Sequence, residues 1–215
     1  MTDASPPEPS AAPAPPSGEA PVPGPRKPRK VFLLIGIVLA VALGIFLFTG
    51  LGTSPSSSGA PHEGDRVPSF TASNIGPVGP SQVSVPGDGG GNGTPAVLMF
   101  FGAWCTSCKQ ELPPLTAAIR RQNAAGGALA RIRVMGVDSF DSASVAEPFM
   151  ATEGVRFPVA SDPQADITNG LFYFRGDPYT VFVKGDGTIS RIVIGAQLDP
   201  STFTADERAL IPSGT

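Results

Sequence analysis

Residues 97–113 read VLMFFGAWCTSCKQELP. The apolar, uncharged run at 96–101 predicts a buried β-strand, and the pattern after it predicts a helix from about Thr106 to Gln122. Two cysteines, Cys105 and Cys108, lie where the strand ends and the helix begins. A thiol at such a junction faces the unpaired backbone N–H groups of the first helical turn. The stretch therefore predicts a strand–helix unit with a thiol at the helix N-terminus.

The cysteine pair has the two-residue gap of a redox-active dithiol. A helix N-terminus lowers the pKa of the thiol in such motifs, and the thiolate is the nucleophile of disulfide exchange. We therefore expect Cys105 to attack a substrate disulfide. Cys108, one turn into the helix and closer to the sheet, is expected to resolve the mixed disulfide. The disulfide Cys105–Cys108 is itself the redox group, and the sequence predicts no further cofactor.

Two other interpretations of the cysteine pair are weaker. A structural zinc site needs four nitrogen or sulfur ligands, whereas the chain has two cysteines and one histidine, His62. We therefore expect no metal. A purely structural disulfide would close so short a loop that it adds little stability, and free thiols outside the cytoplasm would oxidise. Redox exchange is the favoured function of the pair.

The composition limits which domain organisations and binding partners are possible. The chain has 215 residues, with 15 Lys and Arg against 18 Asp and Glu, and a formal net charge of -3. Because no excess positive charge is available to neutralise a phosphate backbone, we expect no nucleic-acid partner. Glycine (26 residues) and proline (25) are concentrated in segments, so they mark linkers and loops. One globular domain with N-terminal attachments is the simplest organisation.

The first 63 residues divide into three predicted segments. Residues 1–30 form a disordered, Pro/Ala-rich tail. Residues 31–51 are uncharged and apolar, and as a helix they would extend about 31 Å, which predicts a transmembrane helix. Basic residues at 26–30 flank this helix, so the positive-inside rule places the tail in the cytoplasm. Residues 52–63 form a Gly/Ser-rich tether.

This topology predicts a single-pass protein of the cell membrane whose domain, residues 64–215, is extracytoplasmic. A cleaved signal peptide is the alternative, which the small residues at 58–60 leave open. Within the domain, periodicity predicts strands at 69–74, 82–85, 96–101, 132–137, 179–183 and 188–194, helices at 106–122, 144–153, 166–171 and 200–209, and a glycine-rich loop at 87–93. This order predicts an α/β fold whose central mixed sheet is covered on both faces.

Residues 97–113 resemble the signature of the thioredoxin fold, and in particular the TlpA/ResA-like membrane-anchored thiol-disulfide oxidoreductases. Residues 64–70, 157–162 and 176–187 are similar to further parts of that family, so the resemblance covers about 64–210. It implies a thioredoxin-like fold in which Pro178 is cis, leaving the backbone before it free to pair with an extended substrate. The implied substrate groove on this chain consists of Trp104, Thr106, Ser107, Asp177 and Pro178.

The resemblance also implies substrates and partners. Such proteins exchange disulfides with exported proteins, receive electrons from a membrane donor, and include reductants of apocytochrome c in cytochrome c maturation. The direction of disulfide exchange stays open, because the same fold also serves oxidative folding. A non-enzymatic alternative is a redox-inert module that binds a peptide near Pro178. A peroxiredoxin is rejected, since Gly102 and Leu98 stand where its peroxidatic-cysteine pattern requires threonine and proline.

Three positions depart from the family pattern. Met99 replaces a buried aspartate of thioredoxin, so proton transfer must involve water or another group. Thr106 and Ser107, between the cysteines, differ from the proline-containing pairs of relatives, so the reduction potential cannot be inferred from them. Asp177 replaces an uncharged residue before the proline. A carboxylate near Cys105 would disfavour its thiolate and favour a reductant, whereas one pointing into water would have almost no effect. Trp104 either covers the site or belongs to the core.

Overall fold

The computed structural model describes residues 59–195 and 199–212. The predicted tail (1–30), the predicted transmembrane helix (31–51) and most of the tether lie outside the described residues. Among the residues that are described, none of the helices combines the length and apolarity needed to cross a bilayer.

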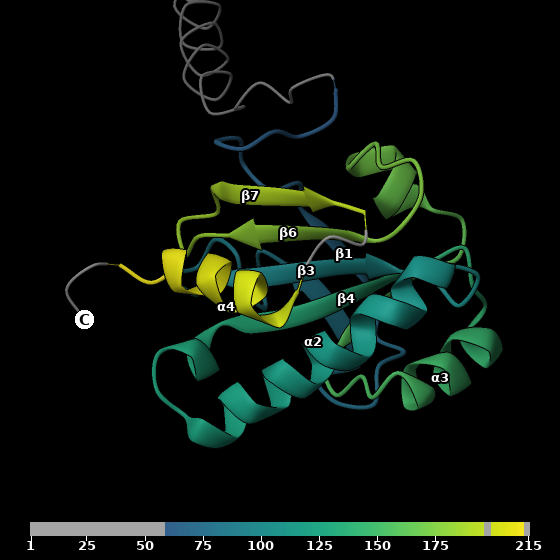
Figure 1. Ribbon diagram of the computed structural model, residues 1–215. Coiled ribbons are helices and arrows are strands. Elements are labelled where there is room, and N and C mark those ends of the chain that lie inside the picture. The colour runs from purple at the N-terminus through teal and green to yellow at the C-terminus, as the bar shows by residue number, and fades with distance from the viewer. Residues whose placement is uncertain (1–58, 196–198, 213–215) are drawn as a thin grey trace, which may run out of the picture. The chain divides into compact units, whose positions relative to one another are not determined.

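A five-stranded mixed sheet forms the centre of the domain (Figure 1). Its strand order is β5 (Val159–Asp162), β4 (Arg133–Ser139), β3 (Ala96–Phe101), β6 (Tyr179–Val183) and β7 (Ile189–Ile194). Strands β3, β4 and β5 are parallel, while β6 and β7 run antiparallel to their neighbours. The register pairs Phe101 with Asp138 and Phe100 with Tyr179. The ends of β3 and β4 and the start of β6 therefore meet at one edge.

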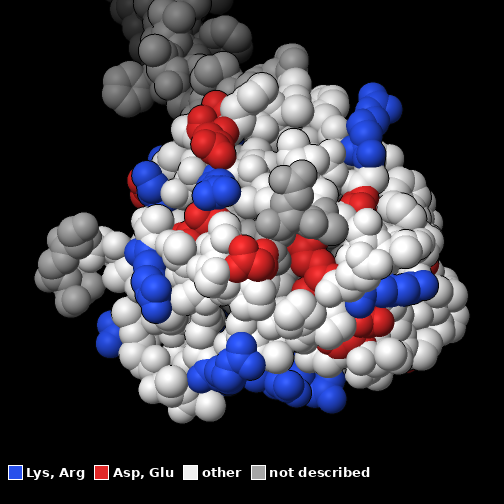
Figure 2. Space-filling view, viewed as in Figure 1, with Lys and Arg blue, Asp and Glu red and all other residues white. Residues whose placement is uncertain are grey.

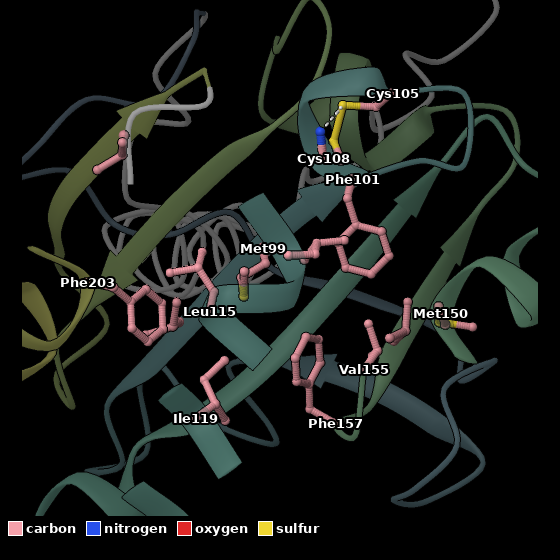
Figure 3. Packing of buried hydrophobic residues seen from close by; sticks show 14 of the residues in the cluster. Met99, Phe101, Cys105, Cys108, Leu115, Ile119, Met150, Val155, Phe157 and Phe203 are labelled. Carbon is pink, nitrogen blue, oxygen red and sulfur yellow. Dashed lines mark hydrogen bonds between the residues drawn. A yellow bond between two sulfur atoms is a disulfide. The ribbon is translucent and has the colours of Figure 1, made fainter. Parts of the chain in front are cut away.

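The alternating side chains of β3 separate two apolar layers. Val97, Met99 and Phe101 pack with the helices α2 (Thr106–Ala125), α3 (Ala143–Thr152) and α4 (Pro200–Ala209), as Figure 3 shows for part of this cluster. Leu98 and Phe100 pack on the other face with the hairpin of β1 (Phe70–Ser73) and β2 (Gln82–Val85) and with residues around the π-helical turn η2 (Asp166–Leu171). The predicted mixed sheet covered on both faces is confirmed, although a hairpin supplies much of the second cover.

Most predicted elements are present, and the differences are local. The sequence reasoning missed β5 and the 3-10 turn η1 (Leu129–Arg131). The strand β5 is only four residues long, so it offers too little alternation to be recognised without its partner β4. Helix α2 runs to Ala125, beyond the predicted Gln122, and ends before Gly126, whose φ of 72° suits a glycine.

The glycine-rich loop at 87–93 packs on the β6–β7 hairpin. The Gly93 N–H donates to the Gly185 carbonyl at 2.8 Å. A Cβ on Gly185 would lie 2.6 Å from the Gly93 carbonyl oxygen, so only glycine permits this backbone approach. The loop therefore has a packing role at the end of the sheet away from the cysteines.

Candidate active site

Cys105 and Cys108 form a disulfide at the N-terminus of α2. Cys105 is the N-cap residue, and its Sγ accepts the Cys108 backbone N–H at 3.0 Å. Figure 3 shows the disulfide at the margin of the apolar cluster, above Phe101. Both residues are buried, with 3% of Cys105 and none of Cys108 exposed. In the disulfide form a backbone donor of the first helical turn is thus aimed at Cys105 Sγ.

A small cavity lies beneath the disulfide. Its lining includes Cys108, Glu111, Met99 and Pro178. Glu111 is buried in α2, and among the described residues its Oε2 atom has no hydrogen-bond partner. Burial raises its pKa to about 7. The cavity thus places a carboxyl group that can exchange a proton at neutral pH beside the thiol predicted to resolve mixed disulfides.

Glu111 was missed by the sequence reasoning, which left the proton acceptor unassigned. The signal was present, because Cys108, Glu111, Leu112 and Leu115 follow the i, i+3, i+4, i+7 spacing of one helix face. The leucines and the cysteine are buried on that face. A charged residue within an apolar stripe is therefore the feature that could have identified it.

Pro178 borders the same cavity from β6. The Asp177–Pro178 bond is cis, as predicted, and Pro178 itself is buried. The next residue, Tyr179, pairs with Phe100 of β3. This pairing holds Pro178 opposite the loop that leads from β3 to Cys105.

Trp104 lies on the surface beside the disulfide and is not a core residue. About half of it, 48%, is exposed, and its Nε1 donates to the Ser139 carbonyl at 2.9 Å. Its ring packs edge-to-face on Phe140, which is also half exposed. Thr106 is exposed and Ser107 half-buried in the first turn of α2. These side chains border the dithiol, where the substrate groove was predicted.

Asp177 does not direct its carboxylate into water. Both carboxylate oxygens are buried, and within the described residues the Ser139 side chain is the one hydrogen-bonding group that acts on them. Desolvation raises its pKa to about 7, although the nearby Ser139 hydroxyl opposes the shift. The alternative that Asp177 points into water, where solvent would screen its charge from Cys105, therefore does not apply.

Two further aspartates stand at the end of β4. Asp138 is fully buried, with desolvation as the main cause of a pKa raised to about 8. Asp141 accepts the Ala103 backbone N–H at 2.5 Å and so fixes the loop before Cys105. The sequence reasoning missed both, since nothing local marks the end of β4 as a neighbour of the cysteines. In the described part of the chain, no group of three or more His, Cys, Asp or Glu residues could hold a metal ion.

Comparison with known proteins agrees with this geometry. The model of the AhpC/TSA family matches residues 64–192. The chain belongs to the AhpC/TSA family. Among similar proteins is the thiol-disulfide oxidoreductase ResA of Bacillus subtilis (strain 168), 23% identical over 176 residues, covering 81% of this chain and 90% of that protein. The soluble secreted antigen MPT53 of Mycobacterium tuberculosis is 26% identical over 156 residues, covering 70% and 77%.

Solved structures share the fold. A putative thiol:disulfide interchange protein DsbE from Chlorobium tepidum has a TM-score of 0.58 at 21% identity, covering 70% of this chain and 99% of that one. The MTB DsbF structure has a TM-score of 0.56 at 22% identity, covering 67% and 99%. Together, the family, the named relatives and the Cys-x-x-Cys disulfide show that this AhpC/TSA-family member is a thiol-disulfide oxidoreductase of thioredoxin fold. The family match does not make the chain a peroxiredoxin, because Gly102 and Leu98 occupy the positions where a peroxidatic cysteine requires threonine and proline.

Proposed function

We propose that this protein is a membrane-tethered, extracytoplasmic oxidoreductase that reduces disulfides of exported proteins, apocytochrome c being the candidate substrate. The observation that carries the proposal is the Cys105–Cys108 pair at the start of α2, with Glu111 and Pro178 around one cavity. The location rests on the apolar run 31–51 and its basic flank. The secreted antigen among its relatives supports action outside the cytoplasm.

The proposed exchange proceeds through a mixed disulfide. The Cys105 thiolate attacks a substrate disulfide, one substrate sulfur leaves and takes up a proton, and Cys105 is joined to the other. Cys108 then loses its proton to Glu111 and attacks Cys105 Sγ. The second substrate sulfur leaves as a thiolate and takes up the proton from Glu111. The enzyme dithiol has been oxidised and the substrate disulfide reduced, so a membrane electron donor must reduce Cys105–Cys108 again.

The substrate chain binds along the edge near Pro178 in this proposal. Because β6 lies between β3 and β7, an extended segment would pair with the backbone just before Pro178, with its cysteine facing Cys105. Figure 2 shows that acidic side chains gather toward the middle of the face that carries α2 and α4, and basic ones toward its rim. Because this face carries charges of both signs, we expect substrate proteins to be recognised by backbone pairing and by the exposed Trp104 and Phe140 rings. Net charge is then a weaker criterion.

The acidic surroundings of the dithiol support the reducing direction. Negative charge near Cys105 destabilises its thiolate and hence the reduced form, which then gives up electrons more readily. One observation favours the opposite direction, oxidative folding. The Cys108 N–H bonded to Cys105 Sγ stabilises the thiolate and hence the reduced form. The reduction potential of Cys105–Cys108 decides between the two.

Insulin reduction with a thiol donor tests the activity. We expect turnover by the domain and none by Cys105→Ser, with Asp166→Asn as an exposed surface control. Equal, donor-only rates for all three proteins would leave a redox-inert peptide-binding module as the function. For the location, protease added to spheroplasts should digest the domain and spare the tail. A protected domain would reverse the topology.

A further inference from the structure

Both carboxylate oxygens of Asp138 and both of Asp177 are buried. Those of Asp138 have no hydrogen-bond partner among the described residues, and the Ser139 side chain is the one hydrogen-bonding group that acts on Asp177 there. A buried polar group without a partner is costly, and an unpaired charge is more so. Two such carboxylates cannot both remain ionised at low cost. A bound proton relieves one of them.

The two aspartates lie in a field of further aspartates. The charges that act on Asp138 come from Asp141, Asp177 and Asp162, and those that act on Asp177 come from Asp162 and Asp141. No Lys or Arg is among the groups that shift either one in the described part of the chain. Asp141 accepts a hydrogen bond from Ala103, and Asp162 accepts hydrogen bonds from Ile167 and Thr168. Within the described residues, Asp138 and Asp177 lack such backbone donors on their buried oxygens.

This aspartate pair is joined to the cysteine loop from both sides. Asp138 is opposite Phe101 in the β3–β4 register, and Phe101 is the last strand residue before the loop to Cys105. Asp177 precedes Pro178, which lines the cavity that Cys108 and Glu111 also line. In this loop, Trp104 donates a hydrogen bond to Ser139 and Ala103 donates one to Asp141, both shortly after Asp138 in the chain. Asp138 and Asp177 are thus held by the segments that pack against the loop before Cys105.

We propose that Asp138 and Asp177 bind a proton when Cys105–Cys108 is reduced and release it when the disulfide forms again. They act through the charge on Cys105 and are positioning residues for its thiolate. Two electrons come from a donor dithiol, which becomes a disulfide and frees two protons. The Cys105–Cys108 bond breaks, one proton goes to Cys108, the other goes to the aspartate pair, and Cys105 remains a thiolate.

The titration ranges support this assignment. Burial raises the pKa of Asp177 to about 7 and that of Asp138 to about 8, so the pair is partly protonated near neutral pH in the disulfide form. A thiolate nearby raises the proton affinity of both carboxyl groups further. Reduction at about pH 8 then adds protons to the pair, and a proton on the pair in turn makes the thiolate less costly.

Reduced-minus-oxidised infrared difference spectra of the domain at about pH 8 test the proposal directly. A protonated carboxyl band should appear on reduction in the wild type and in Asp166→Asn, an exposed control. The band should be lost in Asp138→Asn and weakened or lost in Asp177→Asn, while Glu111→Gln keeps it. No band in the wild type, or a band abolished only by Glu111→Gln, would overturn the assignment.

A second measurement is the equilibrium constant for exchange with dithiothreitol between about pH 6 and 8.5. Formation of a thiolate without proton uptake makes this constant rise about tenfold per pH unit. Proton uptake by the pair should flatten the rise above pH 7 in the wild type and not in the double variant Asp138→Asn/Asp177→Asn. Identical slopes would count against the proposal. Both tests use the isolated redox reaction, so their outcome is independent of the substrate proposed above.

Discussion

Glu111 and Cys108 line the same cavity beneath the first turn of α2, three residues apart on its buried face. Cys108 must lose a proton before it can attack Cys105. Glu111 is an acid whose pKa is raised to about 7, so at neutral pH it can both accept and return that proton.

Glu111→Gln should therefore slow the resolution of mixed disulfides by roughly 10²-fold, the lower end of the range for acid–base catalysis. Formation of the mixed disulfide by Cys105 should be nearly unchanged. Stopped-flow measurement of both steps checks this. Glu207→Gln is the matched control, because Glu207 is also buried with a pKa raised to about 7, but in α4. An equal effect of both variants would remove Glu111 from the mechanism.

The same two carboxyl groups predict an unusual pH dependence of stability. Their pKa is higher in the folded than in the unfolded chain, so the stability they contribute is complete below about pH 4.5 and lost as pH rises through 7. At pH 8, Glu207→Gln should raise the free energy of unfolding, on the order of 3 kcal/mol. Chemical denaturation at pH 5 and 8 checks this. A gain that is equal at both values would point to packing instead of ionisation.

Cys108→Ser should trap mixed disulfides through Cys105. Cys108 is fully enclosed, whereas Cys105 is the N-cap with a backbone donor on its Sγ. Iodoacetamide should accordingly label Cys105 in the reduced domain below about pH 8. Peptide mapping of the labelled protein and non-reducing gels of membranes provide the measurements. Equal trapping by Cys105→Ser would mean that attacking and resolving roles are not distinct.

Asp177→Asn should lower the pKa of Cys105 and raise the reduction potential, by about 30 mV for each 1.4 kcal/mol of relief. The effect is expected at about pH 8, above the Asp177 pKa of about 7, and should fade at about pH 5.5, where the carboxyl group is neutral. Redox titrations followed by the single tryptophan, Trp104, give the potentials. A more negative potential in the variant would contradict the electrostatic argument.

Asp141→Ala should loosen the loop that presents Cys105, since it removes the acceptor of the Ala103 N–H. We expect a loss of about 1 to 3 kcal/mol in stability from the unsatisfied donor. Asp141→Asn, which keeps an acceptor oxygen, should recover most of it. Thermal unfolding of the two variants separates the hydrogen bond from the charge.

Features that depend on near neighbours in the chain could be predicted from the residue pattern. An uncharged apolar run gave β3, helical periodicity gave α2, and the junction between them placed Cys105 at a helix N-terminus. The bounds predicted for β2, β6 and α4 are those observed, because alternation and N-terminal caps are local signals.

The distant groups that surround the dithiol could not be predicted, because long-range pairing and packing bring them together. Asp138 and Asp177 are far from Cys105 in sequence, and the register of β3 with β4 and β6 brings their segments to one edge. The short β5 likewise depends on its pairing with β4. Burial of Glu111, Asp138 and Asp177 follows from packing, and their raised pKa values follow from burial. Acid–base chemistry thus depends on long-range packing, whereas the position of the nucleophile is local.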